Sequence, residues 1–462
     1  MPSGPERLLD EPAGPVEFHR ARSLVLAHPG RWRVIYHYDG DGIAAASSAL
    51  RAFRRLGYPV QATPLLAVER PRMVDLLSAT AGPVLVVDTG ASWLDAYADH
   101  AHPVVILDHH KYPGAPHPPE LPKHVAFVNP LNWGVDGMDE LCAATLTWLF
   151  TVFLDEANWD NAPWGLSGAI ADRQHQNGFH GLNARLVAEA EARGLVKRRP
   201  RLALFGTTVG EAVARSIDPF VRGLSGRPAA VKTFLEGLGI EAALPRSELS
   251  EPDERKLGQA LLGRLVHQKV RPEFAALLTQ DGYLLPGLKV DAQELSNWQN
   301  ASGRAGEPSV GIALALGDRA ALARAREHEE AWRSGILATL VRLEEKGVNS
   351  LSAIQWFESE ESTLAGTQAG LAMNYLVDPN RPLFVFSKGE GVLKISGRGT
   401  LYLVGRGLDL SQVLRTAAAK VGGEGGGHRV AAGATIPAGA RDEFLSEADR
   451  LVAGQLPQEA AA

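Results

Sequence analysis

One stretch near the N-terminus, an apolar run that ends in three side chains able to bind metal, most constrains how this chain can fold. Residues 34–42 read VIYHYDGDG, so His37, Asp39 and Asp41 stand at alternate positions. On an extended segment this spacing places the three side chains on one side of the chain. The glycines beside the aspartates permit a sharp turn, and the alanine-rich stretch from Ile43 to Leu56 predicts a helix after it. A strand that ends at polar residues and leads into a helix is typical of the ligand edge of an open α/β sheet.

The same residues also fit a solvated Asp-Gly turn, so their chemistry depends on whether the pattern recurs. An EF-hand loop is excluded, because the twelfth position counted from His37 or from Asp39 is Ser48 or Leu50 and not glutamate. One imidazole and two carboxylates crowded together favour a cation among them. Their nitrogen and oxygen donors suit Mn²⁺ or Mg²⁺.

The pattern recurs after two further apolar runs, residues 84–87 (VLVV) and 104–107 (VVIL). Such runs are typical of parallel strands that are buried on both faces. The residues that follow them are these: Asp88 after the first run, and Asp108, His109 and His110 after the second. A fourth carboxylate, Asp172, follows the small apolar segment 165–171. Capping aspartates or core histidines explain each case alone, but their recurrence favours a metal site.

The composition sets wider bounds on the class of protein. A length of 462 residues predicts two or three domains, and a formal charge of −6 gives no global basic signature, so nucleic-acid binding would need a local patch. The single cysteine, Cys142, excludes an internal disulfide framework and fits a reducing compartment, so we expect a cytoplasmic protein. The most apolar window, Leu141 to Leu154, is too short to span a bilayer. We therefore expect no membrane partner.

The second half of the chain predicts a charged helix followed by a smaller lobe. The helix covers residues 320–343, and most of its charge reads as a solvated face. In the lobe we expect strands at 354–357, 383–386, 394–398 and 401–404, a helix at 410–421, and a glycine-rich loop at 422–427 before His428. Such a loop exposes N–H groups that can hold an oxyanion. The basic cluster 197–201 (KRRPR) reads as a solvated loop, and contact with nucleic acid is the alternative.

Four motifs follow one another along the chain: His37-x-Asp39-x-Asp41-Gly42, Asp88-x-Gly90, Asp108-His109-His110 and Gly168-x-x-x-Asp172. Together they resemble the motifs of the DHH phosphoesterase superfamily, which includes RecJ exonucleases, oligoribonucleases, cyclic-dinucleotide phosphodiesterases and manganese pyrophosphatases. The resemblance implies a parallel-sheet domain with two Mn²⁺ ions, or Mg²⁺ in their place. It implies these ligands: His37, Asp39 and Asp88 for one ion, and Asp41, Asp88, His109 and Asp172 for the other. Asp88 would bridge the ions, His110 would face the substrate phosphate, and Asp108 would orient the histidines.

Two later segments extend the resemblance to nearly the whole chain. Asn300-Ala301-x-Gly303-Arg304 is similar to a motif of RecJ-type nucleases, and its surroundings, with the segments 181–183 and 205–206, are most similar to short archaeal RecJ-like proteins. The run from Gly425 to His428 resembles the GGGH motif of the DHH-associated domain. The implied substrate-binding residues are Asn300, Arg304, Arg398, Gly426, Gly427 and His428. A helix end with a solvated arginine, or a flexible linker, is the ordinary alternative for each segment alone.

The predicted fold class is therefore α/β, with a parallel-sheet DHH domain joined by a long connector helix to a smaller α/β DHH-associated domain. We expect the domains at residues 1–318 and 349–456, with the connector at 319–348. The implied function is Mn²⁺-dependent hydrolysis of single-stranded DNA or RNA from an end, 5′ to 3′, with release of mononucleotides.

Two other readings of the function stay open. Because there is no room after His428 for the further oligonucleotide-binding barrel of bacterial RecJ, short oligonucleotides, dinucleotides or cyclic dinucleotides remain alternative substrates. A replication or repair protein would be the protein partner, and a scaffold without catalysis is disfavoured because every ligand position is filled. A pyrophosphatase fits the chain length and the C-terminal glycine-rich run poorly.

Overall fold

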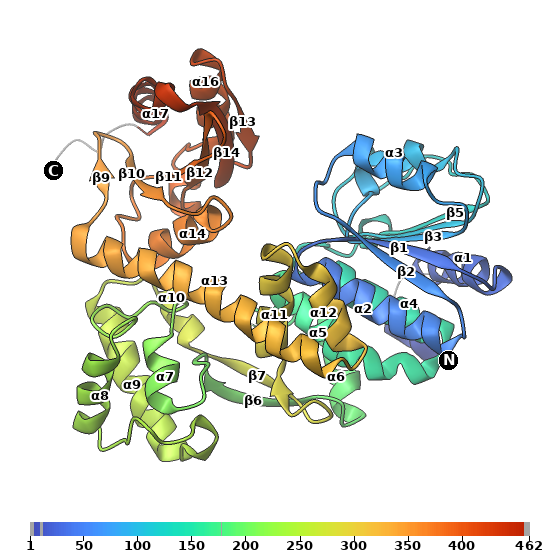
Figure 1. Cartoon of the computed structure of the whole chain (residues 1–462), viewed down its shortest axis with the longest axis horizontal. Coiled ribbons are helices and arrows are strands. Elements are labelled where there is room, and N and C mark those ends of the chain that lie inside the picture. Colours follow the sequence, from blue (N-terminus) through green and yellow to red (C-terminus); the bar gives the residue numbers. More distant parts are fainter. Residues whose placement is uncertain (1–3, 10–12, 177, 457–462) are drawn as a thin grey trace. The chain divides into compact units, whose positions relative to one another are not determined.

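The computed structural model of the chain describes residues 4–9, 13–176 and 178–456, and these fall into two compact units (Figure 1). Unit 1 comprises the residues up to 201 and 280–330, and unit 2 comprises 202–279 and the residues from 331 onward. The chain passes from one unit to the other for the last time within helix α13 (Arg319–Lys346). The long helix predicted from the charged stretch is therefore confirmed.

A five-stranded parallel sheet with the strand order β2-β1-β3-β4-β5 forms the centre of unit 1. The strands are β1 (Trp32–His37), β2 (Val60–Leu65), β3 (Val84–Val87), β4 (Val104–Leu107) and β5 (Val125–Val128). The last three are buried along their whole length, as their continuous apolar runs predict. In this strand order the topological switch point lies between β1 and β3, which is where open α/β sheets bind ligands.

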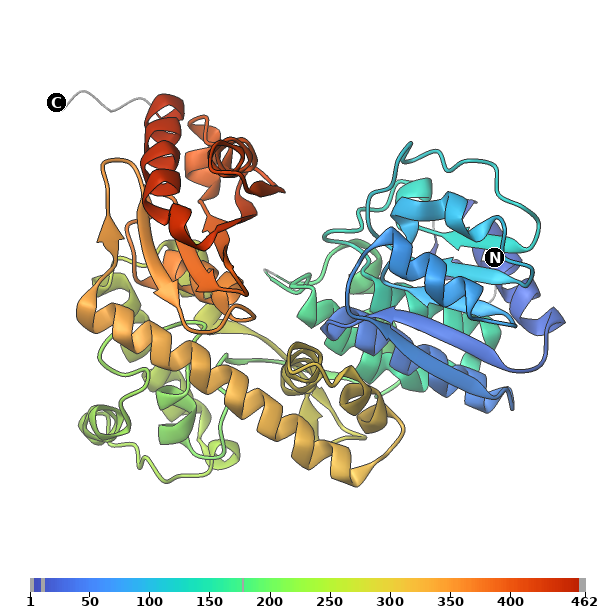
Figure 2. The same cartoon turned by 45° about the horizontal axis from the view of Figure 1, so that its top comes forward.

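Helices cover both faces of this sheet (Figures 1 and 2). One face is covered by α1 (Ala13–Ala27), α2 (Gly40–Arg55), α4 (Ala143–Leu154) and α5 (Ala162–Ala171), and the other by α3 (Arg70–Ser78) and the 3-10 helix η2 (Ala91–Tyr97). Val34 and Tyr36 of β1 belong to the core on the first face, whereas Ile35 belongs to the core on the second. This alternation is the period of two of an extended strand. The α/β class with a parallel sheet is confirmed.

The next elements pack on the helices of unit 1 or form a separate sheet, β6-β7-β8. They are α6 (Gly181–Ala192), β6 (Lys197–Leu202), β7 (Thr279–Leu285), β8 (Val290–Asp291), α11 (Ala292–Arg304) and α12 (Pro308–Ala315). The expectation that the basic cluster forms a loop is wrong, because residues 197–202 form the edge strand of the sheet β6-β7-β8. An edge strand tolerates Pro200, and Arg201 is held by an ion pair of 2.7 Å with Asp291.

Unit 2 combines a helical segment with a six-stranded sheet whose order is β13-β14-β12-β11-β10-β9. The helices before the sheet are α7 (Val209–Ala214), α8 (Pro228–Gly237), α9 (Glu251–His267) and α10 (Pro272–Ala275). The strands are β9 (Asn349–Ser350), β10 (Gln355–Ser359), β11 (Leu383–Lys388), β12 (Val392–Arg398), β13 (Glu424–Gly427) and β14 (Ala431–Pro437). The accompanying helices are α14 (Ala365–Tyr375), α15 (Leu401–Gly405), α16 (Leu410–Lys420) and α17 (Arg441–Gln455).

Two expectations for the second lobe are wrong in detail. Residues 401–404 form helix α15 and not a strand, because Thr400 caps its first turn by accepting from Leu403 N, and only Leu403 is buried. The glycine-rich run forms strand β13 and not a loop, because it pairs with β14. A Cβ on Gly425 would lie 2.7 Å from the carbonyl oxygen of Leu414, so the close approach of α16 requires glycine there.

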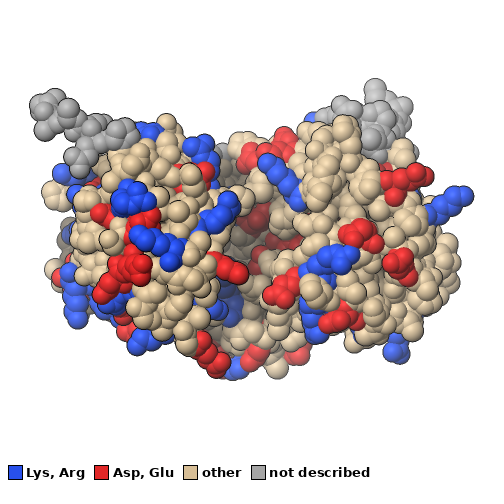
Figure 3. Space-filling model, turned by 90° about the horizontal axis from the view of Figure 1, so that it is seen from above, with Lys and Arg blue, Asp and Glu red and all other residues tan. Residues whose placement is uncertain are grey.

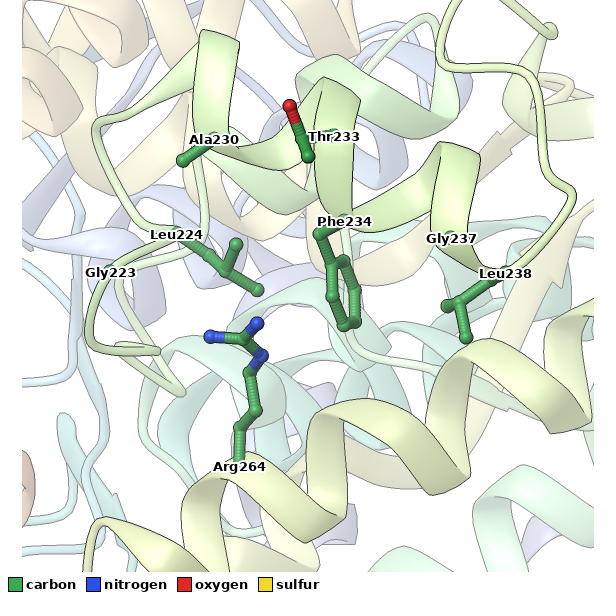
Figure 4. Close-up of a pocket in the computed structure, with 8 residues that line it drawn as sticks. All are labelled: Gly223, Leu224, Ala230, Thr233, Phe234, Gly237, Leu238 and Arg264. Atoms are coloured by element: carbon green, nitrogen blue, oxygen red, sulfur yellow. The ribbon is translucent and has the colours of Figure 1, made fainter.

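The face of the molecule shown in Figure 3 has no field of a single sign. Basic and acidic side chains are interspersed over the face in Figure 3. Among the described residues, each helix is too short or too polar to traverse a bilayer. A pocket in the helical segment of unit 2 is lined by Leu224, Phe234 and Leu238, with the guanidinium of Arg264 4.8 Å from the Phe234 ring centroid (Figure 4). Its lining holds no carboxylate, histidine or cysteine, so the metal-capable residues lie elsewhere.

Candidate metal centre

The ends of β1, β3 and β4 bring the metal-capable side chains of unit 1 together around Asp88. His37 Nδ1 lies 3.1 Å from Asp39 Oδ2 and 3.3 Å from Asp88 Oδ2. On the other side, His109 Nε2 lies 3.3 Å from Asp88 Oδ1 and 3.7 Å from Asp41 Oδ2. The two oxygens of the Asp88 carboxylate therefore face two different histidines.

These side chains form three groups, and the ligand atoms within each group all lie within 4.8 Å of one another. Two groups consist only of predicted ligands, namely His37, Asp39 and Asp88, and Asp41, His109 and Asp172. The third group joins Asp88 and His109 to Asp108 and His110. All six residues predicted as metal ligands are thus brought together. Asp88 itself has φ 58, in the left-handed region that few side chains tolerate. Backbone strain of this kind clusters at functional sites.

The expectation that His37, Asp39 and Asp41 lie on one side of an extended segment is wrong. Strand β1 ends at His37, and Asp39 is the N-cap of α2, accepting from Gly42 N at 3.1 Å. Asp41 stands in the first turn of that helix and joins the other group of ligand atoms. The helix can begin directly after the strand because residue 42 is glycine. A Cβ at this position would collide with the carbonyl group of His37. The turn between strand and helix therefore divides the motif between the two groups.

Asp41 is held by the N-terminus of α4, which sequence reasoning missed. Its Oδ2 accepts from Ala143 N at 2.9 Å, and its Oδ1 accepts from Ala144 N at 2.9 Å. The thiol of Cys142 donates to Oδ1 at 3.0 Å. Free backbone N–H groups at a helix N-terminus stabilise a carboxylate. The apolar window 141–154 marks this element in the sequence, but nothing in that pattern indicates the contact with Asp41.

One tautomer of His109 follows from its hydrogen bond. His109 Nδ1 donates to the carbonyl oxygen of Gly137 at 2.6 Å, and a carbonyl only accepts. In the neutral ring the lone pair is therefore on Nε2, the nitrogen that faces Asp88 and Asp41. Metal-binding histidines commonly donate their other nitrogen to a carbonyl in this way.

Asp108 orients His110 through hydrogen bonds. Its Oδ1 accepts from His110 Nδ1 at 2.7 Å and from His110 N at 3.2 Å, and its Oδ2 accepts from Ala91 N at 2.8 Å. Asp108 is 1% exposed, whereas half of the His110 side chain is exposed. The His110 ring is therefore oriented by a buried carboxylate while part of it stays open to solvent.

The charges in this cluster fit divalent cations. Burial, together with the charges of Asp88 and Asp172, raises the pKa of Asp41 well above its usual range. Burial also raises the pKa of Asp172 to about 6, although the nearby His109 opposes the shift. Conversely, His109 and His37 donate to Asp88 when their rings are protonated, and these hydrogen bonds outweigh burial and lower the pKa of Asp88. Four carboxylates around two imidazoles leave an excess of negative charge, and this set of oxygen and nitrogen donors suits Mn²⁺ or Mg²⁺.

Small residues in two motifs let helices reach the site. A Cβ on Gly168 would collide with Ala144, so glycine allows α5, whose C-cap is Asp172, to pack against α4. A Cβ on Gly303 would collide with the carbonyl oxygen of Tyr38, so α11 also approaches the loop that carries Asp39. Asn300 consequently lies beside Gly40, since a Cβ on that glycine would be 3.2 Å from Asn300 Cβ. Arg304, four residues further along α11, is exposed.

The other predicted substrate-binding residues share one end of the sheet in unit 2. Arg398 pairs with Ala431 across β12 and β14, and Gly427 pairs with Ala432 across β13 and β14. Arg398 is thus two strands away from Gly427, about 10 Å. Burial lowers the pKa of Arg398, whose Nη1 donates to the carbonyl oxygen of Gly397 at 2.9 Å.

The glycine-rich end of that sheet is open. His428 is exposed, and its backbone N–H donates to Ala431 O at 2.8 Å. A Cβ on Gly426 would meet nothing within 4 Å, so this backbone is accessible. Gly427 has φ 137, which favours glycine. Arg398, Gly426, Gly427 and His428 all belong to unit 2, whereas Asn300 and Arg304 belong to unit 1.

A parallel sheet that gathers carboxylates and histidines at its switch point is typical of a metal-dependent enzyme. Residues 31–172 match the family model of the DHH family, N-terminal domain, and residues 356–454 match that of the DHHA1 domain. The chain belongs to the DHH superfamily of metal-dependent phosphoesterases, with an N-terminal DHH domain and a C-terminal DHHA1 domain. The predicted family is confirmed.

Similar proteins share this fold over nearly the whole chain. An uncharacterized protein of Methanocaldococcus jannaschii is 28% identical over 440 residues, which covers 94% of this chain and 96% of that protein. The crystal structure of exonuclease RecJ bound to manganese has a TM-score of 0.60 at 18% identity and covers 96% of each chain. That of CDC45 from Entamoeba histolytica has a TM-score of 0.63 at 11% identity and covers 95% of this chain and 99% of that chain.

Proposed function

We propose that this chain is a Mn²⁺-dependent phosphodiesterase that hydrolyses single-stranded nucleic acid from an end, 5′ to 3′, and releases mononucleotides in the cytoplasm. The observation that carries the proposal is the Asp88 carboxylate, whose two oxygens face His37 and His109 at 3.3 Å each. A shared carboxylate is what a pair of metal ions requires. Two divalent ions, when bound, neutralise a phosphodiester and activate water for its hydrolysis.

The proposed ligands divide as the two groups do. One ion would be held by His37, Asp39 and Asp88, and the other by Asp41, Asp88, His109 and Asp172. Gly137 O accepts from His109 Nδ1, so in the neutral ring Nε2 offers its lone pair, and the N-terminus of α4 keeps Asp41 in place. These contacts orient ligands before any ion arrives, which is how surrounding hydrogen bonds tune metal sites.

Substrate contacts are proposed for both units. Asn300 and Arg304 would bind near the metal ions, since α11 packs on the loop that carries Asp39. The open backbone of Gly426 and Gly427 would hold a phosphate or a terminal sugar. The remaining proposed contacts are those of Arg398 and His428. The likeness to a structure of exonuclease RecJ supports a nucleic-acid substrate, and a replication or repair protein is the proposed partner.

His110→Ala is expected to keep both metal ions and to lower kcat by about 10²–10³-fold, because positioned proton donors and acceptors contribute on this order. Its ring is oriented by Asp108 and is half exposed, so we assign it to the substrate phosphate. Metal content and steady-state kinetics check the variant together. A loss of bound Mn²⁺ equal to the loss of rate would make His110 a metal ligand instead.

Arg304→Ala and His428→Ala are each expected to raise KM for a single strand while the metal content stays unchanged. Losing one charge-assisted phosphate contact costs on the order of 1.5–3 kcal/mol, or roughly 10–150-fold. Arg255→Ala, at an exposed arginine that pairs with Glu251 on α9, is the control and should keep the wild-type KM. Unchanged KM in both test variants contradicts the proposed substrate grip.

The polarity of digestion is tested with a single strand labelled at its 3′ end, in the presence of Mn²⁺. Progressive shortening of labelled fragments supports 5′ to 3′ digestion, whereas immediate release of a labelled mononucleotide means the opposite direction. Cleavage of circular single strands rules out recognition of an end. Faster turnover of a dinucleotide or a cyclic dinucleotide than of the long strand makes the small-molecule reading the correct one.

A further inference from the structure

A buried amide, that of Gln174, connects two residues of the same proposed ligand group. Gln174 is 1% exposed and stands two residues after Asp172. Its Nε2 donates to Asp172 Oδ2 at 2.7 Å and to Gly137 O at 2.8 Å. The same carbonyl oxygen accepts from His109 Nδ1 at 2.6 Å. One side chain therefore links a carboxylate at the end of α5 with a histidine at the end of β4.

The hydrogen bonds of Gln174 permit only one orientation of its amide. Both partners of Nε2 are acceptors, and Oε1 accepts from Asn183 Nδ2 at 2.7 Å. The reversed amide would set Oε1 against a carbonyl and a carboxylate, and NH₂ against NH₂. Asn183 is fully buried, and its Oδ1 has no hydrogen-bond partner in the described part of the chain. The contribution of Asn183 is therefore the donor that orients Gln174.

Backbone geometry on three sides supports this network. Arg173, with φ 63, reverses the chain after α5, and Gln174 N then donates to Ala169 O at 2.9 Å. A Cβ on Gly137 would collide with the carbonyl oxygen of His109, so glycine lets this loop reach the histidine. Asn183 N donates to Glu140 O at 2.8 Å, which fixes the start of α6 on the same loop. The segments 134–137 and 181–183 therefore supply the partners that hold Gln174, a role that the ligand assignment alone does not give them.

We infer that Gln174, oriented by Asn183, is a positioning residue that sets the affinity of one metal ion, the one assigned to Asp41, His109 and Asp172. Its amide limits the rotation of the Asp172 carboxylate and shares the carbonyl that fixes the His109 tautomer. It does so without contacting the other ligand group, His37 and Asp39. The inference rests on the proposed ligand set and extends it to an uncharged residue.

The test is Gln174→Met in the full-length chain, because methionine keeps the length of the side chain and removes all three hydrogen bonds. Mn²⁺ titrations by calorimetry, and by the electron paramagnetic resonance of free Mn²⁺, should show one of two sites weakened by about 10–100-fold and the other unchanged. Activity should return at higher Mn²⁺ concentration, because only occupancy is reduced.

Gln299→Met is the matched control for a buried amide that contacts α5 but no proposed ligand. Gln299 is fully buried, and its Oε1 accepts from Ser167 Oγ at 2.7 Å. We expect this variant to have a lower melting temperature than the wild-type chain but the same Mn²⁺ affinities. A control that weakens Mn²⁺ binding as strongly as Gln174→Met overturns the inference, because general destabilisation of α5 then explains both.

The outcomes separate this inference from the function on which it rests. If the wild-type chain does not bind two Mn²⁺ ions, the ligand assignment is wrong, and both the proposed function and this inference are overturned. Two ions in the wild type and unchanged affinities in Gln174→Met overturn the inference alone, as does equal weakening of both sites. If Gln174→Met does not fold, Asn183→Ala is used instead. This variant removes the hydrogen bond that orients the Gln174 amide and keeps the Gln174 NH₂ group itself. Selective weakening of one site in that variant supports the inference, and unchanged affinities overturn it.

Discussion

Asp88→Asn is expected to abolish the binding of both metal ions and to lower kcat/KM for a single strand by on the order of 10³-fold. Asp88 Oδ2 faces His37 and Oδ1 faces His109, each at 3.3 Å, so one substitution reaches both proposed ion sites. An amide offers one neutral oxygen and directs an NH₂ group, which repels cations, at the other site. Metal ions contribute several kcal/mol of transition-state stabilisation, and about 4 kcal/mol corresponds to roughly 10³-fold in rate.

The Asp88→Asn variant is expected to fold, because asparagine shares with aspartate the tolerance for a left-handed backbone at φ 58. Metal content after dialysis against buffer with trace Mn²⁺, together with circular dichroism, separates loss of metal from loss of fold. The control is Asp95→Asn, because the Asp95 side chain is 71% exposed and pairs with Arg70 outside the site. Retention of two ions by Asp88→Asn would refute the bridging role.

Removal of metal with excess EDTA is expected to abolish hydrolysis and to destabilise unit 1. Without cations, burial and the mutual repulsion of the carboxylates raise the pKa of Asp41 well above its usual range and that of Asp172 to about 6. An ion present at 100 times its dissociation constant stabilises the folded state by about 2.7 kcal/mol. For a unit of this size that free energy corresponds to a rise of roughly 5–10 °C in melting temperature for each ion.

Thermal unfolding in EDTA, then after Mn²⁺ is restored, measures this stabilisation. Asp88→Asn serves as the control, since a variant that binds no ion should show the same melting temperature in EDTA and in Mn²⁺. Hydrolysis at the wild-type rate after dialysis into excess EDTA would exclude a metal-dependent reaction. A melting temperature that does not respond to Mn²⁺ in the wild-type chain contradicts the assignment of the carboxylates as ligands.

Local sequence patterns predicted the elements that carry the site. The apolar runs 84–87 and 104–107 are buried parallel strands, and the polar residues directly after them meet at one edge of the sheet. That outcome depends only on hydrophobic periodicity and on the geometry of parallel strands, both of which act over a few residues. Spacing alone misplaced Asp41, because a two-residue period holds only while the chain stays extended, and α2 begins at Gly40.

The second lobe shows where local pattern fails. Residues 401–404 are apolar enough for a strand, yet Thr400 caps them as a helix, and Leu401 and Tyr402 remain exposed. The glycine-rich run has low intrinsic strand propensity, but pairing with β14 and the close approach of α16 make it strand β13. In both cases contacts outside the segment outweigh the preferences of its own residues.

By itself, the sequence determined the α/β class, the identity of the metal-capable residues and their order along the chain. Only the tertiary structure decided how those residues are held: Asp41 by N–H groups of α4 more than a hundred positions away, and His109 and Asp172 by Gly137 and Gln174. The physical reason is that the ability of a side chain to bind a metal depends on its residue type, which can be read directly from the sequence. Orientation instead depends on hydrogen bonds between distant segments, which exist only after the helices have packed on the sheet.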